Sequence, residues 1–170
     1  MISNVAIRDE TVADIAEITA VTVKAFSSLD ISNHTEQFVI SALRNARVLT
    51  LSLVAELHGE IIGHIAFSPV HISDGSLSWY GLGPVSVLPD YQKRGIGGAL
   101  VQEGLERLKL MQAKGCCVVG HPEYYPKFGF EHIPGLLVEG VPPEAFFALP
   151  FDGRAPQGTV TFHEAFNATC

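Results

Sequence analysis

The chain has 170 residues, of which 47% are apolar and 17% charged, a composition that allows one sizeable core and excludes an intrinsically disordered chain. A formal net charge of −7 argues against a nucleic-acid-binding surface, which needs a basic face. No apolar run approaches the roughly 20 residues that cross a bilayer, and residues 1–8 lack the basic start of a signal peptide. We therefore expect a cytoplasmic protein without a membrane or nucleic-acid partner.

Periodicity and turn residues predict elements in the order βααβββαβαβ. In chain order these are a strand at 5–8, helices at 15–25 and 38–43, strands at 48–57, 61–70 and 77–88, a helix at 95–113, a strand at 116–120, a helix near 122–128 and a strand at 130–133, with a further terminal strand expected at 159–163. Thr11 with Asp14, and Asn33 with Glu36, resemble capping boxes before the first two helices. The order predicts an α+β (mixed α/β) fold with a mixed sheet.

The three cysteines predict neither a disulfide framework nor a metal site. Cys116 and Cys117 are adjacent, so their side chains would point to opposite faces of a strand, and Cys170 is the last residue. No CxxC or HxxxH spacing is present. We expect no bound metal.

The segment most informative about chemistry is a strand, a glycine-rich loop and a helix start at residues 82–100. Gly95, Gly97 and Gly98 carry no side chain that would obstruct the backbone N–H groups of the first helical turn. Those donors and the positive end of the helix dipole attract anions. Lys93 and Arg94 add positive charge beside them, and several charge-assisted bonds of about 1.5–3 kcal/mol each can hold a pyrophosphate.

Two familiar phosphate motifs fit this segment poorly. A Walker A loop needs Lys-Ser/Thr after its second glycine, and residues 95–100 contain neither. A dinucleotide-binding fingerprint needs a glycine or alanine at its sixth position, where this chain has Leu100. Taken alone, a glycine-rich helix start without a ligand remains an alternative.

The same residues resemble a family motif. Gln92-x-x-Gly95-x-Gly97-Gly98 is similar to the Q/R-x-x-G-x-G/A motif of the GNAT acetyltransferase superfamily, and it lies on the expected strand–loop–helix. In that family the backbone amides of the loop bind the pyrophosphate of coenzyme A, and the preceding strand contacts the pantetheine and the acetyl carbonyl.

A second resemblance lies downstream and is independent of the first. GNAT proteins commonly carry a Tyr five residues before the Phe of a Gly-Phe pair, and here Tyr125 precedes Phe130 of the pair Gly129-Phe130 by five residues. Together with the tail segments 141–147 and 158–160, the run 82–130 is similar to the YhbS-like subgroup of predicted acetyltransferases.

The resemblance implies a single GNAT domain over residues 1–170, in which 134–170 form a C-terminal extension. Its central sheet would be mixed, mostly antiparallel and twisted, with helices on its flanks. Acetyl-CoA would be the co-substrate, without a metal. The residues that would contact it are Val85, Ser86, Val87, Gln92, Lys93, Arg94, Gly95, Ile96, Gly97, Gly98 and Ala99.

The resemblance also implies a catalytic role for Tyr125, whose phenol can protonate the departing coenzyme A thiolate. Packing in the core is the alternative role for this side chain. A backbone N–H near Val87 would stabilise the oxyanion. The group that deprotonates the amine stays open among Glu123, His121, His64 and a water relay.

The predicted function is therefore acetyl transfer from acetyl-CoA to a primary amine by direct attack in a ternary complex. The acceptor, a small molecule or a peptide, is not identified by the sequence, and a homodimer is left open. We expect the tail after Ile133 to shape the acceptor side. The alternatives are a coenzyme A-binding module without turnover and an amine-binding protein unrelated to coenzyme A.

Overall fold

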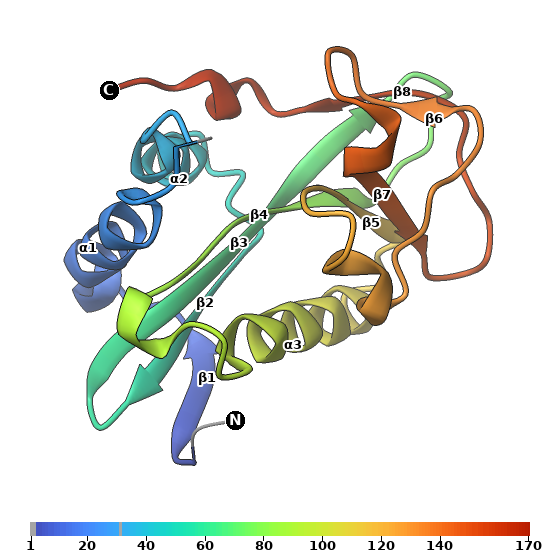
Figure 1. Cartoon of the computed structure of the whole chain (residues 1–170). Coiled ribbons are helices and arrows are strands. Elements are labelled where there is room, and N and C mark those ends of the chain that lie inside the picture. Colours follow the sequence, from blue (N-terminus) through green and yellow to red (C-terminus); the bar gives the residue numbers. More distant parts are fainter. Residues whose placement is uncertain (1–2, 31) are drawn as a thin grey trace.

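A mixed sheet forms the centre of the protein, whose computed structural model describes residues 3–30 and 32–170 (Figure 1). The strands are β1 (Val5–Asp9), β2 (Leu51–Leu57), β3 (Glu60–Ile72), β4 (Trp79–Val87), β5 (Gly115–Val119), β6 (Leu136–Leu137), β7 (Phe146–Pro150) and β8 (Gly158–Phe162). The helices are α1 (Ile15–Phe26), α2 (Glu36–Asn45) and α3 (Ile96–Leu110). The strand order is β1-β2-β3-β4-β5-β7, while β8 pairs with the far end of β3 and β6 pairs with β8.

Most neighbouring strands are antiparallel, and the described pairs that run parallel are β4–β5 and β6–β8. The expected α+β class and mixed, mostly antiparallel sheet are therefore confirmed. No helix in the described ranges is long and apolar enough to span a bilayer.

Helices cover both faces of the sheet, α1 and α2 on one side and α3 on the other (Figure 1). Strand β2 illustrates how its residues alternate between the two covered faces. Val54 packs in one apolar cluster with residues of α1 and α2, whereas its neighbours Leu53 and Ala55 pack with residues of α3. Because both faces are covered, consecutive residues of β2 and of the first two thirds of β3 are buried, without alternation between buried and exposed positions.

The start of α1 is tied to the first strand through Asp14. Its carboxylate accepts a hydrogen bond from the backbone N–H of Thr11 at 2.7 Å, as the capping signature predicts, and another from the Arg8 guanidinium at 2.7 Å. The bond from Arg8 is the main reason that the pKa of Asp14 lies well below its usual value. The second predicted capping box is wrong, because α2 is capped at Thr35 and Glu36 instead bonds to the Ser32 hydroxyl at 2.8 Å.

The central strands β4 and β5 separate part-way along their length. Their parallel pairing runs from Trp79–Gly115 to Gly81–Cys117, and β4 then continues to Val87 beside β3 alone. The register between β3 and β4 also slips by one residue between Ile65 and Phe67, which bends this part of β4. The edge of β4 beyond Gly81 that faces β5 is therefore left without a strand partner in the described chain.

The segment after β5 differs most from the prediction. Instead of a full helix at 122–128, the chain forms a short 3₁₀ turn at Tyr125–Phe128. Residues 130–133 do not form a strand; Glu131 makes a single bridge to Ala148. The strands that the sequence did not predict are β6 and β7, and β7 pairs with β5 along its whole length. This pairing joins segments far apart in the chain, so local propensity does not reveal it. The expected terminal strand is present as β8.

Candidate active site

The glycine-rich loop is held at the end of β4 by Gln92, whose side-chain amide donates to the backbone carbonyl of Val87 at 3.0 Å. Gly95 then caps α3 with φ of 85°, a left-handed conformation that glycine adopts without strain. The first turn of α3 contains no acidic residue, and no side chain caps it. Its backbone N–H groups are consequently available to an external anion.

A cavity of about 450 Å³ lies over this helix start, and we call it the loop cavity. Of the residues expected to contact the cofactor, those that line it are Val85, Val87, Gln92, Lys93, Gly95, Gly97 and Gly98. A Cβ atom on Gly97 would lie 3.2 Å from the Tyr124 hydroxyl, so the glycine keeps the approach to the helix open. The geometry and the donors fit a phosphate group.

The other expected contacts lie elsewhere. Ser86 is buried. The Ile96 side chain is 1% exposed and packs in the core between α3 and the sheet, so only the backbone of Ile96 can face a ligand. The Arg94 side chain is exposed, and neither it nor Ala99 lines the loop cavity.

Lys127 is a basic residue of the loop cavity that the sequence pattern does not indicate. Its ammonium lies 4.0 Å from the centre of the Tyr124 ring, a cation–π contact that holds the charge at the cavity wall. The glycine motif does not indicate it, because Lys127 lies in the 3₁₀ turn Tyr125–Phe128, 29 residues after Gly98 (127 − 98).

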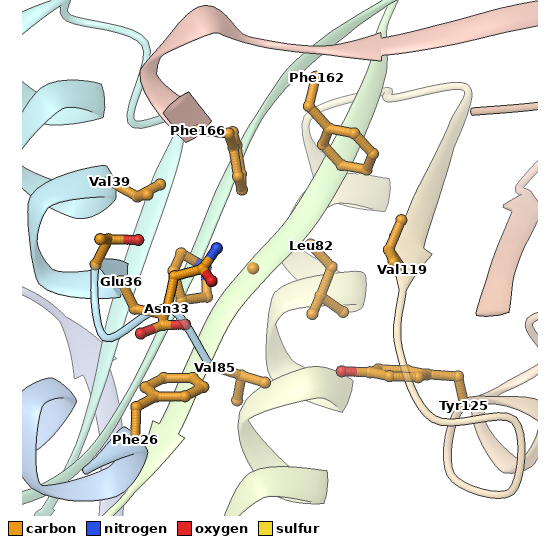
Figure 2. A pocket seen from close by; sticks show the side chains of 13 residues that line it. Phe26, Asn33, Glu36, Val39, Leu82, Val85, Val119, Tyr125, Phe162 and Phe166 are labelled. Atoms are coloured by element: carbon orange, nitrogen blue, oxygen red, sulfur yellow. The ribbon is translucent and has the colours of Figure 1, made fainter. Parts of the chain in front are cut away.

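A second cavity of about 450 Å³, the Tyr125 cavity, opens at the split between β4 and β5. Leu82, Val85, Val119 and Tyr125 form one side of it, and Glu36 and Val39 lie on the opposite side (Figure 2). The Tyr125 hydroxyl points into this space (Figure 2). Val85 lines both cavities.

Aromatic neighbours hold the Tyr125 ring, which is 7% exposed. It packs edge-on against Tyr124 and Phe130, with ring centres 5.1 and 5.8 Å apart. Burial, with smaller contributions from Tyr124 and Cys116, raises the pKa of Tyr125 well above its usual value. The phenol is therefore protonated at neutral pH and able to donate a hydrogen bond into the cavity.

None of the three side chains considered as a base lines either cavity. His121 and Glu123 are exposed on the loop after β5. His64 is fully buried, and its Nε2 lies 2.7 Å from the Ser52 hydroxyl, which in turn bonds to Glu10. Burial is the main cause that lowers the pKa of His64 to about 4, so the ring is neutral at pH 7.

Both strand cysteines are buried on β5, Cys116 in the cluster with α3 and Cys117 in a different cluster, as adjacent strand residues should be. Burial raises the pKa of each thiol. Both thiols therefore stay protonated at neutral pH, and neither can act as a nucleophile. The described residues include no group of three metal-ligating side chains.

Comparison with known proteins identifies the family. The family model for the "Acetyltransferase (GNAT) domain" matches residues 49–132. The chain is 36% identical to the uncharacterized N-acetyltransferase YhbS of Escherichia coli K12 over 126 residues, which are 74% of this chain and 72% of YhbS. It is 40% identical to the uncharacterized N-acetyltransferase YjhQ of the same strain over 87 residues, 50% of this chain and about half, 48%, of YjhQ.

Solved structures agree with these matches. A GNAT family acetyltransferase from Brucella melitensis in complex with acetyl-CoA is 47% identical with a TM-score of 0.86, over 96% of this chain and 98% of that one. The crystal structure of E. coli YhbS in complex with CoA is 32% identical with a TM-score of 0.88, over 98% and 93% of the two chains. The two motifs, the fold and these relatives together show that the chain belongs to the GNAT acetyltransferase family and is similar to YhbS.

Proposed function

We propose that this protein transfers an acetyl group from acetyl-CoA to a primary amine at the split between β4 and β5. The observation that carries the proposal is the position of Val85, which lines both the loop cavity and the Tyr125 cavity. A thioester whose phosphates occupy the loop cavity can follow β4 past Val85 and bring its acetyl group to the Tyr125 hydroxyl. The acetyl-CoA and CoA complexes of the Brucella and E. coli relatives support this choice of co-substrate.

The loop cavity supplies the anion-binding groups. The free N–H groups of the first turn of α3 and the helix dipole favour the pyrophosphate, and Gly97 leaves room for it. Lys93 and Lys127 add two positive charges to the cavity wall of a protein whose net charge is −7. Gln92 acts indirectly, because its hydrogen bond to Val87 fixes the loop to the strand.

The unpaired edge of β4 supplies the groups for the acetyl end. Past Gly81, backbone N–H groups on this edge have no strand partner among the described residues, and they can donate hydrogen bonds to the acetyl carbonyl oxygen as negative charge develops on it. Donors placed in this way contribute about 3 kcal/mol to lowering an acyl-transfer barrier.

Proton transfers complete the reaction. The acceptor ammonium first loses one proton to water, and the neutral nitrogen attacks the thioester carbonyl carbon. A C–N bond forms and the C–S bond breaks, while Tyr125 gives its proton to the leaving sulfur. The second proton lost by nitrogen returns through water to the Tyr125 oxygen. Burial keeps the Tyr125 phenol in the protonated form that this step needs, and the raised pKa also makes it a weaker acid than a free phenol.

An amine library incubated with acetyl-CoA and the protein, and followed by mass, tests the proposal. We expect at least one amine to gain an acetyl group while an equal amount of free thiol appears. Acetyl-CoA alone should also raise the unfolding free energy, by about 2.7 kcal/mol at a hundredfold excess over its Kd. Stabilisation by acetyl-CoA without acetylation of any amine would contradict turnover and indicate a coenzyme A-binding module.

A further inference from the structure

Aromatic side chains from widely separated parts of the chain gather at the Tyr125 cavity. Phe26 ends α1, Phe162 ends β8, and Phe166 lies in the 3₁₀ turn Glu164–Asn167 that follows β8. The rings of Phe162 and Phe166 are 5.3 Å apart and inclined at 59°. Figure 2 shows both at the end of the cavity away from Phe26. The cavity therefore has aromatic walls at both ends.

The surrounding packing holds these walls in place. Phe162 pairs with Val70 of β3, and its ring lies directly over Gly81, where a Cβ atom would be only 2.5 Å from a ring carbon. Phe166 packs with Ala165, Val39 and other apolar residues of α2. Residues of the C-terminal extension thus contribute a fixed surface to the cavity, and the role of this surface in acceptor binding is part of the proposal below.

Glu36 is the charged side chain among the residues that line this cavity. The Ser32 hydroxyl lies 2.8 Å from both carboxylate oxygens, but its single hydrogen can be donated to only one of them. Lone pairs of the carboxylate therefore remain for another donor, and no cation pairs with Glu36 in the described part of the chain. Asn33 and Thr35 also line the cavity but carry no charge. A carboxylate at the wall of this mostly apolar cavity favours a ligand that brings a positive charge.

The size of the cavity limits the ligand. Its volume of about 450 Å³ is at the lower end of the range of about 300–1,000 Å³ typical of small-molecule sites. Part of this space, beside Val85 and Tyr125, would be taken by the acetyl group. Figure 2 shows Glu36 on the wall across from Tyr125, so an amine bound to its carboxylate would lie between the two.

We infer that the acceptor is a small arylalkylamine, whose ammonium is bound by Glu36 and whose ring packs against Phe162 and Phe166 at one end of the cavity. This inference rests on the proposed acetyl transfer and adds the substrate class. The same charge disfavours aromatic amino acids, because their α-carboxylate would be repelled by Glu36 inside an apolar cavity. A long polar amine would leave the aromatic walls unfilled.

A comparison of kcat/KM for four probes tests the inference: 2-phenylethylamine, phenylalanine, putrescine and a lysine-containing peptide. We expect 2-phenylethylamine to be the best acceptor and phenylalanine, which has the same ring and amine, to be at least about tenfold worse, the cost of one unfavourable charged contact. Higher kcat/KM with putrescine or with the peptide would overturn the inference.

Variants of Glu36 and Phe166 test whether these two residues recognise the amine. Glu36→Gln should raise KM for 2-phenylethylamine about tenfold or more, reduce the preference over phenylalanine and leave KM for acetyl-CoA unchanged. Phe166→Ala should raise the same amine KM. The matched control is Glu164→Gln, which alters an exposed acid in the turn that carries Phe166 but outside the cavity, and should change neither KM.

Calorimetry separates failure of this inference from failure of the proposed function. With CoA-saturated protein, 2-phenylethylamine should bind to the wild type and at least about tenfold more weakly to Glu36→Gln. If other amines are acetylated while 2-phenylethylamine neither binds nor reacts, acetyl transfer stands and the substrate class is wrong. If no amine reacts at all, binding of 2-phenylethylamine that depends on Glu36 still supports the amine site. If 2-phenylethylamine then shows no Glu36-dependent binding, the inference is overturned.

Discussion

Gly120 lies directly against the ring of Tyr125. A Cβ atom on Gly120 would overlap Cε2 of that ring, and it would also lie 3.0 Å from Cδ2. The absence of a side chain at the end of β5 therefore lets Tyr125 reach the wall of its cavity with its hydroxyl directed inward (Figure 2). Gly120, which has no side chain, thus helps to set the position of Tyr125, the proposed acid.

Gly120→Ala should displace the Tyr125 ring and lower kcat while leaving acetyl-CoA affinity nearly unchanged, because the loop cavity is not touched. Steady-state kinetics and calorimetry check this. In a double-mutant cycle with Tyr125→Phe, the two losses should not add, since both remove the same hydroxyl from its place. Fully additive losses would mean that Gly120 acts independently of Tyr125.

Gly97→Glu should abolish acetyl-CoA binding without unfolding the protein. The new carboxylate would occupy the helix start and repel phosphate, while the helix dipole favours a negative charge there. Gly97→Gln, which has the same shape without the charge, is the control and should retain more affinity. Unchanged calorimetric affinity in a folded Gly97→Glu protein would place the phosphates elsewhere.

Lys127→Ala should weaken acetyl-CoA binding about tenfold or more, the effect of losing one charge-assisted contact. Lys114→Ala is a suitable control, because Lys114 is exposed and does not line the loop cavity. The difference between the variants should shrink as salt is raised. Equal affinity of both variants for acetyl-CoA would show that Lys127 does not contribute to the binding of acetyl-CoA.

The buried His64 predicts a specific dependence of stability on pH. Its pKa is lowered to about 4 in the folded protein, so between that pH and the unfolded value of about 6.5 only the unfolded chain binds the proton. Stability should therefore fall with decreasing pH across this window, by up to about 1.4 kcal/mol per pH unit from this group. Urea unfolding at pH 7 and pH 5 measures the slope.

His64→Gln removes this titration and should flatten the slope, whatever its effect on stability at pH 7. His71→Gln is the control, because His71 is exposed. A slope in His64→Gln equal to that of the wild type would show that other groups cause the pH dependence.

The parts of the site that the sequence predicted are local in the chain. The loop from Gln92 to Gly98 follows a strand and opens a helix, so its backbone geometry depends on neighbouring residues and on glycines that permit it. The spacing of Tyr125 from Phe130 likewise describes one compact turn. Residues in such short-range patterns can be located before any tertiary contact is known.

The residues that the sequence did not indicate depend on tertiary packing. Phe162 reaches the Tyr125 cavity only because β8 pairs with the far end of β3, and Glu36 reaches it because α2 packs beside the C-terminal turn. Strand β7 was missed for the same reason, since its partner β5 lies about 30 residues earlier. None of these contacts has a signature in local periodicity.

Tyr125→Phe tests the central claim most directly, because it removes one hydroxyl and keeps the ring packing. Turnover with the best acceptor amine and calorimetric affinity for acetyl-CoA should be measured on both proteins. If Tyr125 protonates the departing sulfur, kcat should fall by about 10²–10⁴-fold while acetyl-CoA affinity stays nearly constant. Full turnover by Tyr125→Phe would contradict the account, since another donor would then protonate the thiolate.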